Sequence, residues 1–104
     1  MRGSLETIVL TLLDEQEEMY GYEITQKVKA ITAGKIKLTK GALYPILHKL
    51  EGQGIPSTRI ASNGNRKRKY YKLTEEGNER VGEKVSEFEV FVESMRLIMN
   101  LKLG

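Results

Sequence analysis

The stretch NGNRKRKYYKL, Asn63 to Leu73, decides the fold that this sequence predicts. It joins an Asn-Gly turn signal to four consecutive cations and two adjacent tyrosines. The strand-like segment IPSTRIA (55–61) precedes it, and Asn-Gly between two strand-like segments is typical of a β-hairpin. We therefore expect the basic run to lie on the second strand of a hairpin.

Strand alternation divides this run between two faces, so at most one of the two tyrosines is expected in a core. The two sets are Arg66, Arg68, Tyr70 and Lys72 on one face, and Lys67, Lys69, Tyr71 and Leu73 on the other. An unpaired charge is costly to bury. Because cations occupy both faces near the tip, the tip is predicted to project into solvent or toward phosphate.

Charge is distributed unevenly along the 104 residues, although the net charge is only +3. Between Ile24 and Thr74 there are twelve Lys and Arg residues and a single acid, Glu51. The flanking segments carry five cations and thirteen acids. Such a dense basic segment is typical of a protein that binds a polyanion such as nucleic acid. The alternative is a solvated basic face without a partner.

Apolar periodicity predicts three helices before the hairpin and one after it. The second helix begins near Tyr20 or Gly21 and ends at the sequence TAGK. Thr39 is the expected N-cap of a third helix that runs to Gly54, and Thr74 is the expected N-cap of the last helix. The core-facing stripes are Leu5, Ile8, Val9, Leu12 and Leu13 in the first helix, Ile24, Val28 and Ile31 in the second, and Leu43, Ile46, Leu47 and Leu50 in the third.

The last helix carries an apolar seam with the spacing of a coiled coil. About 25 residues would make a helix roughly 38 Å long, which is more than a small domain can cover. Self-association is therefore predicted, and packing on the first helix of the same chain is the alternative. The predicted dimer residues are Val81, Val85, Phe88, Phe91, Val92, Met95 and Met99, together with Leu5 of the first helix.

This order of elements predicts a mainly α fold with a β-hairpin wing. We expect a winged helix-turn-helix at residues 1–73, followed by a C-terminal dimerisation helix at residues 74–104. In a helix-turn-helix the second helix lies in the major groove, and the wing would reach the backbone or the minor groove.

Gly41 lies inside the third helix, where glycine costs about 1 kcal/mol relative to alanine. Two explanations are open. A DNA backbone that lies against the start of the helix would favour a residue without a side chain, and so would close packing of this turn against another helix.

Four motifs resemble the PadR family of transcriptional regulators. They are RGSLE (2–6), YGYEI (20–24), KGALYPILHKLEGQGI (40–55) and RKRKYYKLTEEG (66–77), and they are distributed over the first 77 residues. The single C-terminal helix resembles the smaller PadR subfamily. The resemblance implies a homodimeric repressor that binds an operator in double-stranded DNA and is released by a small molecule.

The resemblance also implies which residues contact DNA. The candidates are Thr39, Lys40, Gly41, Ala42 and Tyr44 at the start of the recognition helix, Lys49 further along it, and Arg66, Lys67, Arg68 and Lys69 in the wing. Tyr44 has a second interpretation as a half-buried packing residue. Ala42 stands where many members of the family have Thr or Ser, so one hydroxyl contact to DNA is missing.

The effector is less well defined. In some small PadR proteins an apolar pore with a tryptophan takes up planar drugs, but this chain has no tryptophan. Its aromatic and methionine residues either line an apolar cavity or simply pack between helices. These residues are Phe88, Phe91, Met95 and Met99.

Other classes of protein are disfavoured. The chain has no cysteine and one histidine, His48, so we expect no metal site, no cofactor and no enzyme activity. Neither a membrane span nor a signal peptide is expected, which predicts a cytoplasmic protein. The start MRGS either is native or is a remnant of an expression vector. An architectural module that binds any duplex is the main alternative to a sequence-specific regulator.

Overall fold

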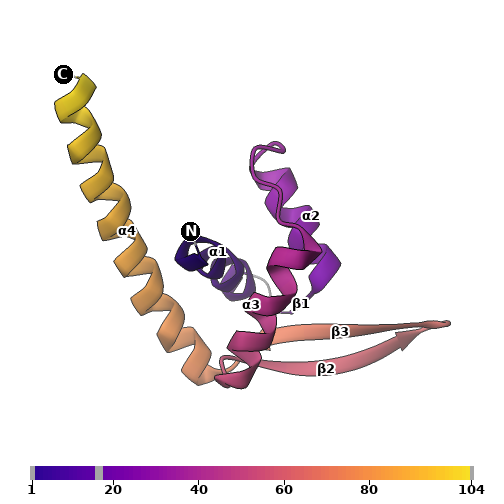
Figure 1. The fold of residues 1–104 in the computed structure, drawn as a ribbon. Helices are drawn as coiled ribbons and strands as arrows, with labels where there is room; N and C mark the ends of the chain where they lie inside the picture. The colour runs from indigo at the N-terminus through magenta and orange to yellow at the C-terminus, as the bar shows by residue number, and fades with distance from the viewer. Residues whose placement is uncertain (1, 16–17, 104) are drawn as a thin grey trace.

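The computed structural model describes residues 2–15 and 18–103. A β-hairpin and a long C-terminal helix point away from a central helical body (Figure 1). The wing, formed by β2 and β3, extends from one side of this body, and the long helix α4 extends from another (Figure 1). The elements in order are α1 (Arg2–Glu15), β1 (Met19–Tyr20), α2 (Gly21–Ile31), α3 (Lys40–Gly52), β2 (Pro56–Asn63), β3 (Arg66–Leu73) and α4 (Glu75–Leu103). The predicted mainly α fold with a β-hairpin wing and a C-terminal helix is confirmed.

One apolar core joins the helices to the base of the wing. The predicted stripes of α1 and α3 supply much of it, but Ile31 of α2 is 67% exposed, because α2 ends at that residue. The prediction that Ile31 faces the core with Ile24 and Val28 is therefore wrong. The fully or nearly buried core residues are Val9, Leu10, Leu12, Leu13, Met19, Ile24, Val28, Leu38, Leu43, Leu47, Leu50, Ile55, Tyr71, Leu73 and Val81.

The hairpin has the predicted alternation, and it is completed by a strand that the sequence did not predict. Tyr71 and Leu73 are buried, whereas Tyr70 lies on the opposite face and is half-buried. β1 pairs antiparallel with β3, which gives the sheet order β1-β3-β2. The two-residue connection begins with Gly64 at φ +65°, and glycine at the first central position is preferred in a type II′ turn.

Both predicted N-caps are formed. The Thr39 side chain accepts a hydrogen bond of 3.2 Å from the Ala42 N–H at the start of α3. The Thr74 hydroxyl accepts one of 3.0 Å from the Gly77 N–H at the start of α4. These bonds satisfy backbone donors that the first turn of a helix otherwise leaves unpaired.

The carbonyl oxygen of Ile55 joins the wing to α4. It accepts hydrogen bonds from both the backbone N–H and the hydroxyl of Thr74, at 3.0 and 2.9 Å. Gly77 lies so close that a Cβ there would be 2.3 Å from the same oxygen. Only glycine therefore fits, and this contact fixes where α4 begins relative to the end of β3.

Most of α4 extends beyond the core. Val81 is buried and Val85 packs against the core, but all residues from Glu89 to Leu101 are exposed or half-exposed. The molecule is accordingly elongated, with extents of 58 × 30 × 21 Å. Val81 of α4 packs in the same core as residues of the predicted domain 1–73, so the first turns of α4 stabilise that domain. The domain boundary between residues 73 and 74 stays a prediction.

Two glycines of α4 should respond oppositely to alanine. Gly77→Ala should lower the free energy of unfolding by about 2 kcal/mol, because its Cβ would displace the Ile55 carbonyl. Gly82→Ala is the matched control: no atom of residues 2–15 or 18–103 lies within 4 Å of its Cβ position, so it should raise that free energy by about 1 kcal/mol. Urea unfolding followed by circular dichroism measures both, and equal effects would contradict the close contact at Gly77.

Candidate nucleic-acid interface

A basic cleft of about 660 Å³ lies between the start of α2, one face of α3 and the wing. It brings together predicted DNA-binding residues that are distant in the sequence. Its lining residues are Tyr20, Gly21, Tyr22, Lys40, Tyr44, His48, Arg66, Lys67, Arg68, Lys69 and Tyr71. We use the name basic cleft for this set of residues.

One face of α3 supplies the floor of the basic cleft. Lys40, Tyr44 and His48 are spaced four residues apart, so they lie along the same side of the helix. Lys40 and His48 are exposed, and Tyr44 is 39% exposed. A lysine, a phenol and an imidazole in a row offer donors for phosphate oxygens and for base edges.

The other predicted residues of α3 lie on a different side of the helix. Gly41, Ala42 and Lys49 line a second cavity of about 430 Å³, together with Leu5 and Glu6 of α1. The predicted contacts of α3 are therefore divided between the basic cleft and this second cavity.

Gly41 does not serve packing within the described part of the chain. It is exposed, and among the described atoms a Cβ there would meet only the Thr39 hydroxyl oxygen, at 3.9 Å. Of the two explanations left open by the sequence, close packing against another helix is thus excluded for the residues that the structure describes. The other explanation, close approach of a bound backbone, fits this open position.

Tyr44 packs against the start of α2 while part of its ring faces the basic cleft. A Cβ at Gly21 would be 2.6 Å from the Tyr44 hydroxyl oxygen, so glycine at this position allows the close approach. Gly21 is itself buried. The packing interpretation of Tyr44 is therefore correct for its hydroxyl end, and its exposed surface remains open to a ligand.

The four wing cations differ in their surroundings. Arg66 and Lys67 are exposed at the tip. The Arg68 guanidinium lies over the Tyr20 ring at 4.5 Å, and the Lys69 ammonium donates to the two carboxylate oxygens of Glu51 at 2.7 and 3.1 Å. The hydrogen bond to Glu51 is also the main cause that raises the pKa of Lys69 above its usual value.

Lys49 is likewise paired within the chain. Its ammonium lies 3.5 Å from Oε2 of Glu6, a buried carboxylate of α1. Lys84 of α4 lies 3.8 Å from the other oxygen of the same carboxylate. Glu6 therefore links α3 to α4 through two lysines.

Several residues of the basic cleft were missed by sequence reasoning. Tyr20, Gly21 and Tyr22 belong to the quoted YGYEI motif, but periodicity assigned them only to a helix start. His48 was left without a role, although its position four residues after Tyr44 places it on the same helix face. Strand alternation predicts at most one of Tyr70 and Tyr71 in the core; Tyr71 is the buried one, and its ring also borders the cleft.

The predicted dimer residues range from buried to exposed. Those on α4 are buried near its start and exposed further along the helix. Val81 is buried in the core of the same chain, while Leu5, Val85 and Phe88 are half-buried. The remaining four are between 41% and 53% exposed. They are Phe91, Val92, Met95 and Met99. Further apolar residues are exposed nearby on α4, so a long apolar surface is uncovered in the single chain.

Two other kinds of feature are absent from the described residues. Residues 2–15 and 18–103 contain no helix that is both long and apolar enough to cross a membrane. Across the same part of the chain, no three His, Cys, Asp or Glu side chains gather as metal ligands would.

Comparisons of the sequence and of the fold with known proteins indicate the same family. A model of the transcriptional regulator PadR-like family matches residues 9–83. A protein of Lysinibacillus sphaericus is 33% identical over 101 residues, which are 95% of this chain and 91% of that protein. The matched family region contains the second half of α1, the rest of the helical body, the wing and the first turns of α4.

Solved structures agree with the family match. A transcriptional regulator from Clostridium thermocellum is similar with a TM-score of 0.82 and 29% identity, over 91% of this chain and 92% of that one. Bacillus subtilis PadR, solved in complex with operator DNA, is similar with a TM-score of 0.70 and 28% identity. That similarity covers 79% of this chain and 46% of the Bacillus protein. From its family match and its fold together, the chain belongs to the PadR-like family of transcriptional regulators.

Proposed function

We propose that this protein is a transcriptional repressor that binds a specific operator in double-stranded DNA as a homodimer in the cytoplasm. The basic cleft is the observation that carries the proposal. It sets the exposed Lys40, Tyr44 and His48 of α3 beside the exposed tip cations Arg66 and Lys67. A duplex bound there would receive base contacts from α3 and phosphate contacts from the wing. No enzyme activity, metal or cofactor is part of the proposal.

The first test compares two duplexes. Fluorescence anisotropy should show tighter binding to DNA from upstream of the protein's own gene than to a scrambled duplex. The preference should persist at physiological salt, while both affinities fall as salt rises, because bound phosphates release counterions. Equal affinity for both duplexes would instead favour the architectural module, and binding that is insensitive to salt would reject the basic cleft as a DNA site.

The exposed apolar surface of α4 supports a homodimer. A helix of 29 residues is roughly 43 Å long, and only its first turns are covered by the subunit. Apolar patches of this kind are typical of protein interfaces. A dimer would also place two recognition helices on half-sites about 34 Å apart. Its proposed core is Phe91, Val92, Met95 and Met99, flanked by Phe88 and Val85.

A single charge should disrupt this dimer. Met95→Glu places a carboxylate in the proposed interface and should give monomers with much weaker operator binding, because a buried unpaired charge is costly. Asn100→Glu adds the same charge on the opposite side of α4 and should remain dimeric. Sedimentation velocity distinguishes the two, and a dimeric Met95→Glu protein would contradict the interface.

A small apolar effector has a candidate site at the junction of α1, α2 and α4. A cavity of about 420 Å³ there is almost entirely apolar, and its volume is in the range of ligand pockets. It includes Phe88 but not the other three residues that the sequence suggested for an effector site. Its apolar lining residues are Ile8, Leu12, Val28, Ile31, Ile36, Val85 and Phe88.

An apolar dye tests this cavity. The fluorescence of 1-anilinonaphthalene-8-sulfonate should rise with the native protein and fall substantially with Ile31→Glu, which puts a charge at the mouth of the cavity. Ile60→Glu is the control, because Ile60 of the wing is exposed to the same extent (68% against 67%) and does not line the cavity. Equal dye binding by both variants would place the dye elsewhere.

A further inference from the structure

The wing is held on both of its faces, at two adjacent residues of β3. Neighbouring strand residues point to opposite faces, so Arg68 and Lys69 leave the strand in opposite directions. Arg68 lies over the ring of Tyr20, directly before α2, and Lys69 is bonded to Glu51, in the last turn of α3. One face of the wing is therefore held by the residue that precedes α2, and the other by a residue of α3.

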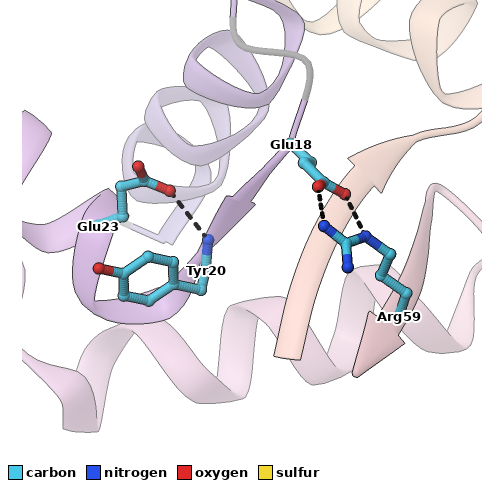
Figure 2. Close-up of polar contacts among 4 residues, drawn as sticks. All are labelled: Glu18, Tyr20, Glu23 and Arg59. Carbon is cyan, nitrogen blue, oxygen red and sulfur yellow. Dashed lines mark hydrogen bonds and ion pairs between the residues drawn. The ribbon is translucent and has the colours of Figure 1, made fainter. Parts of the chain in front are cut away.

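The Tyr20 side is a connected series of contacts. The Tyr20 ring meets Tyr70 edge to face at 5.4 Å, and the Arg59 guanidinium lies over Tyr70 at 4.7 Å. Arg59 binds both carboxylate oxygens of Glu18, with 2.9 Å between Nε and Oε2 (Figure 2). The Tyr20 N–H donates to Oε1 of Glu23 at 3.3 Å (Figure 2). Tyr20 is thus fixed through both its backbone and its ring.

Lys69 is anchored on the other face by a short ion pair. Its ammonium donates to both oxygens of Glu51 and also lies 5.7 Å from the Tyr71 ring. Glu51 is the only acid between Ile24 and Thr74, so the one negative side chain in the basic segment is used to hold the wing. A lysine that is neutralised in this way adds little charge for a phosphate.

Arg66 and Lys67 lie beyond these anchors. They are paired in the sheet with Asn63 and Ser62, next to the turn. Both side chains are exposed, and neither forms an ion pair with another described residue. No acid in the part of the chain that the structure describes therefore compensates their charges, and both residues line the basic cleft.

We propose that the four wing cations have two different roles. Arg66 and Lys67 neutralise DNA phosphates, whereas Arg68 and Lys69, held by Tyr20 and Glu51, fix the direction in which the wing leaves the helix-turn-helix. Tyr20 and Glu51 are then positioning residues for DNA binding. The inference rests on the proposed DNA-binding function and adds to it a division of labour within the wing.

The physical basis is preorganisation. A single exposed cation–π contact or ion pair contributes little to stability. Anchors on opposite faces, however, restrict bending of the hairpin in both directions. A wing that is already ordered loses less conformational entropy when DNA binds, so the anchors strengthen binding by holding the wing in place.

Glu51→Gln gives a test by the sign of its effect. If Lys69 contacts phosphate, removal of the neighbouring acid should strengthen DNA binding. If Lys69 positions the wing, the same substitution should weaken binding about two- to five-fold, with an unchanged dependence on salt. Glu79→Gln, an exposed acid of α4, is the matched control and should bind as the native protein does. Anisotropy titrations at several salt concentrations measure both quantities.

Tyr20 gives an independent test through its ring. Tyr20→Leu should weaken binding about two- to five-fold, and the loss should be smaller for Tyr20→Phe, which keeps the ring that Arg68 lies over. Adding Arg68→Ala to Tyr20→Leu should cause little further loss, because the two residues act together. By contrast, Arg66→Ala and Lys67→Ala should each reduce the salt slope by about 0.9 for each phosphate that the variant no longer neutralises.

The outcomes separate the inference from the proposed function. A native protein that fails to bind DNA would reject the function itself. If the native protein binds DNA in a salt-dependent way, two results would overturn the division of roles alone. One is stronger binding by Glu51→Gln. The other is an equal loss of the salt slope for Lys69→Ala and Lys67→Ala. Thermal unfolding of each variant identifies any loss that arises from misfolding, and Glu51→Gln carries the test if Tyr20→Leu does not fold.

Discussion

Burial of Tyr71 and Leu73 fixes the register of β3, and the arrangement of the basic cleft depends on that register. Both side chains lie in the core, and burial raises the pKa of the Tyr71 phenol because the phenolate would lose its hydration. A shift of one residue would bury Tyr70 and Lys72 in their place and reverse the face of every wing cation. The core therefore determines which wing cation meets Tyr20 before α2, which meets Glu51 of α3, and which lie at the tip without an ion pair to another described residue.

The same register sets the direction of α4. β3 ends at Leu73, so Thr74 follows at the position where it caps α4 and bonds to the Ile55 carbonyl. Gly77 then packs directly on that carbonyl. The proposed contact of the wing with DNA and the proposed association of subunits through α4 therefore both depend on the end of β3 and on the Ile55 carbonyl oxygen.

Local signals in the sequence were sufficient for much of the fold. Thr39 and Thr74 were predicted as caps because their side chains and the residues after them satisfy a local rule. The hairpin and the burial of a single tyrosine followed from Asn-Gly and from strand alternation. The order of the elements predicted the recognition helix and the wing, and the family resemblance supplied the individual residues expected to contact DNA.

Features that depend on tertiary contacts could not be predicted. β1 has only two residues, and it exists because β3 lies beside it. The pairing of Lys69 with Glu51 joins residues 18 positions apart, and charge counting treats that lysine as equal to Lys67. Periodicity alone also could not show that Ile31 lies past the edge of the core, or that Val81 faces inward while Met95 faces solvent.

The uncovered part of α4 has a consequence for how such proteins diverge. Residues from Glu89 to Leu101 lie outside the core, so substitutions there change little in the folding of the subunit or in the basic cleft. With the proposed interface on this segment, a duplicated gene could acquire a new choice of partner through a few changes in α4 and keep its operator. Partner identity and operator identity would then evolve as nearly independent traits of one short chain.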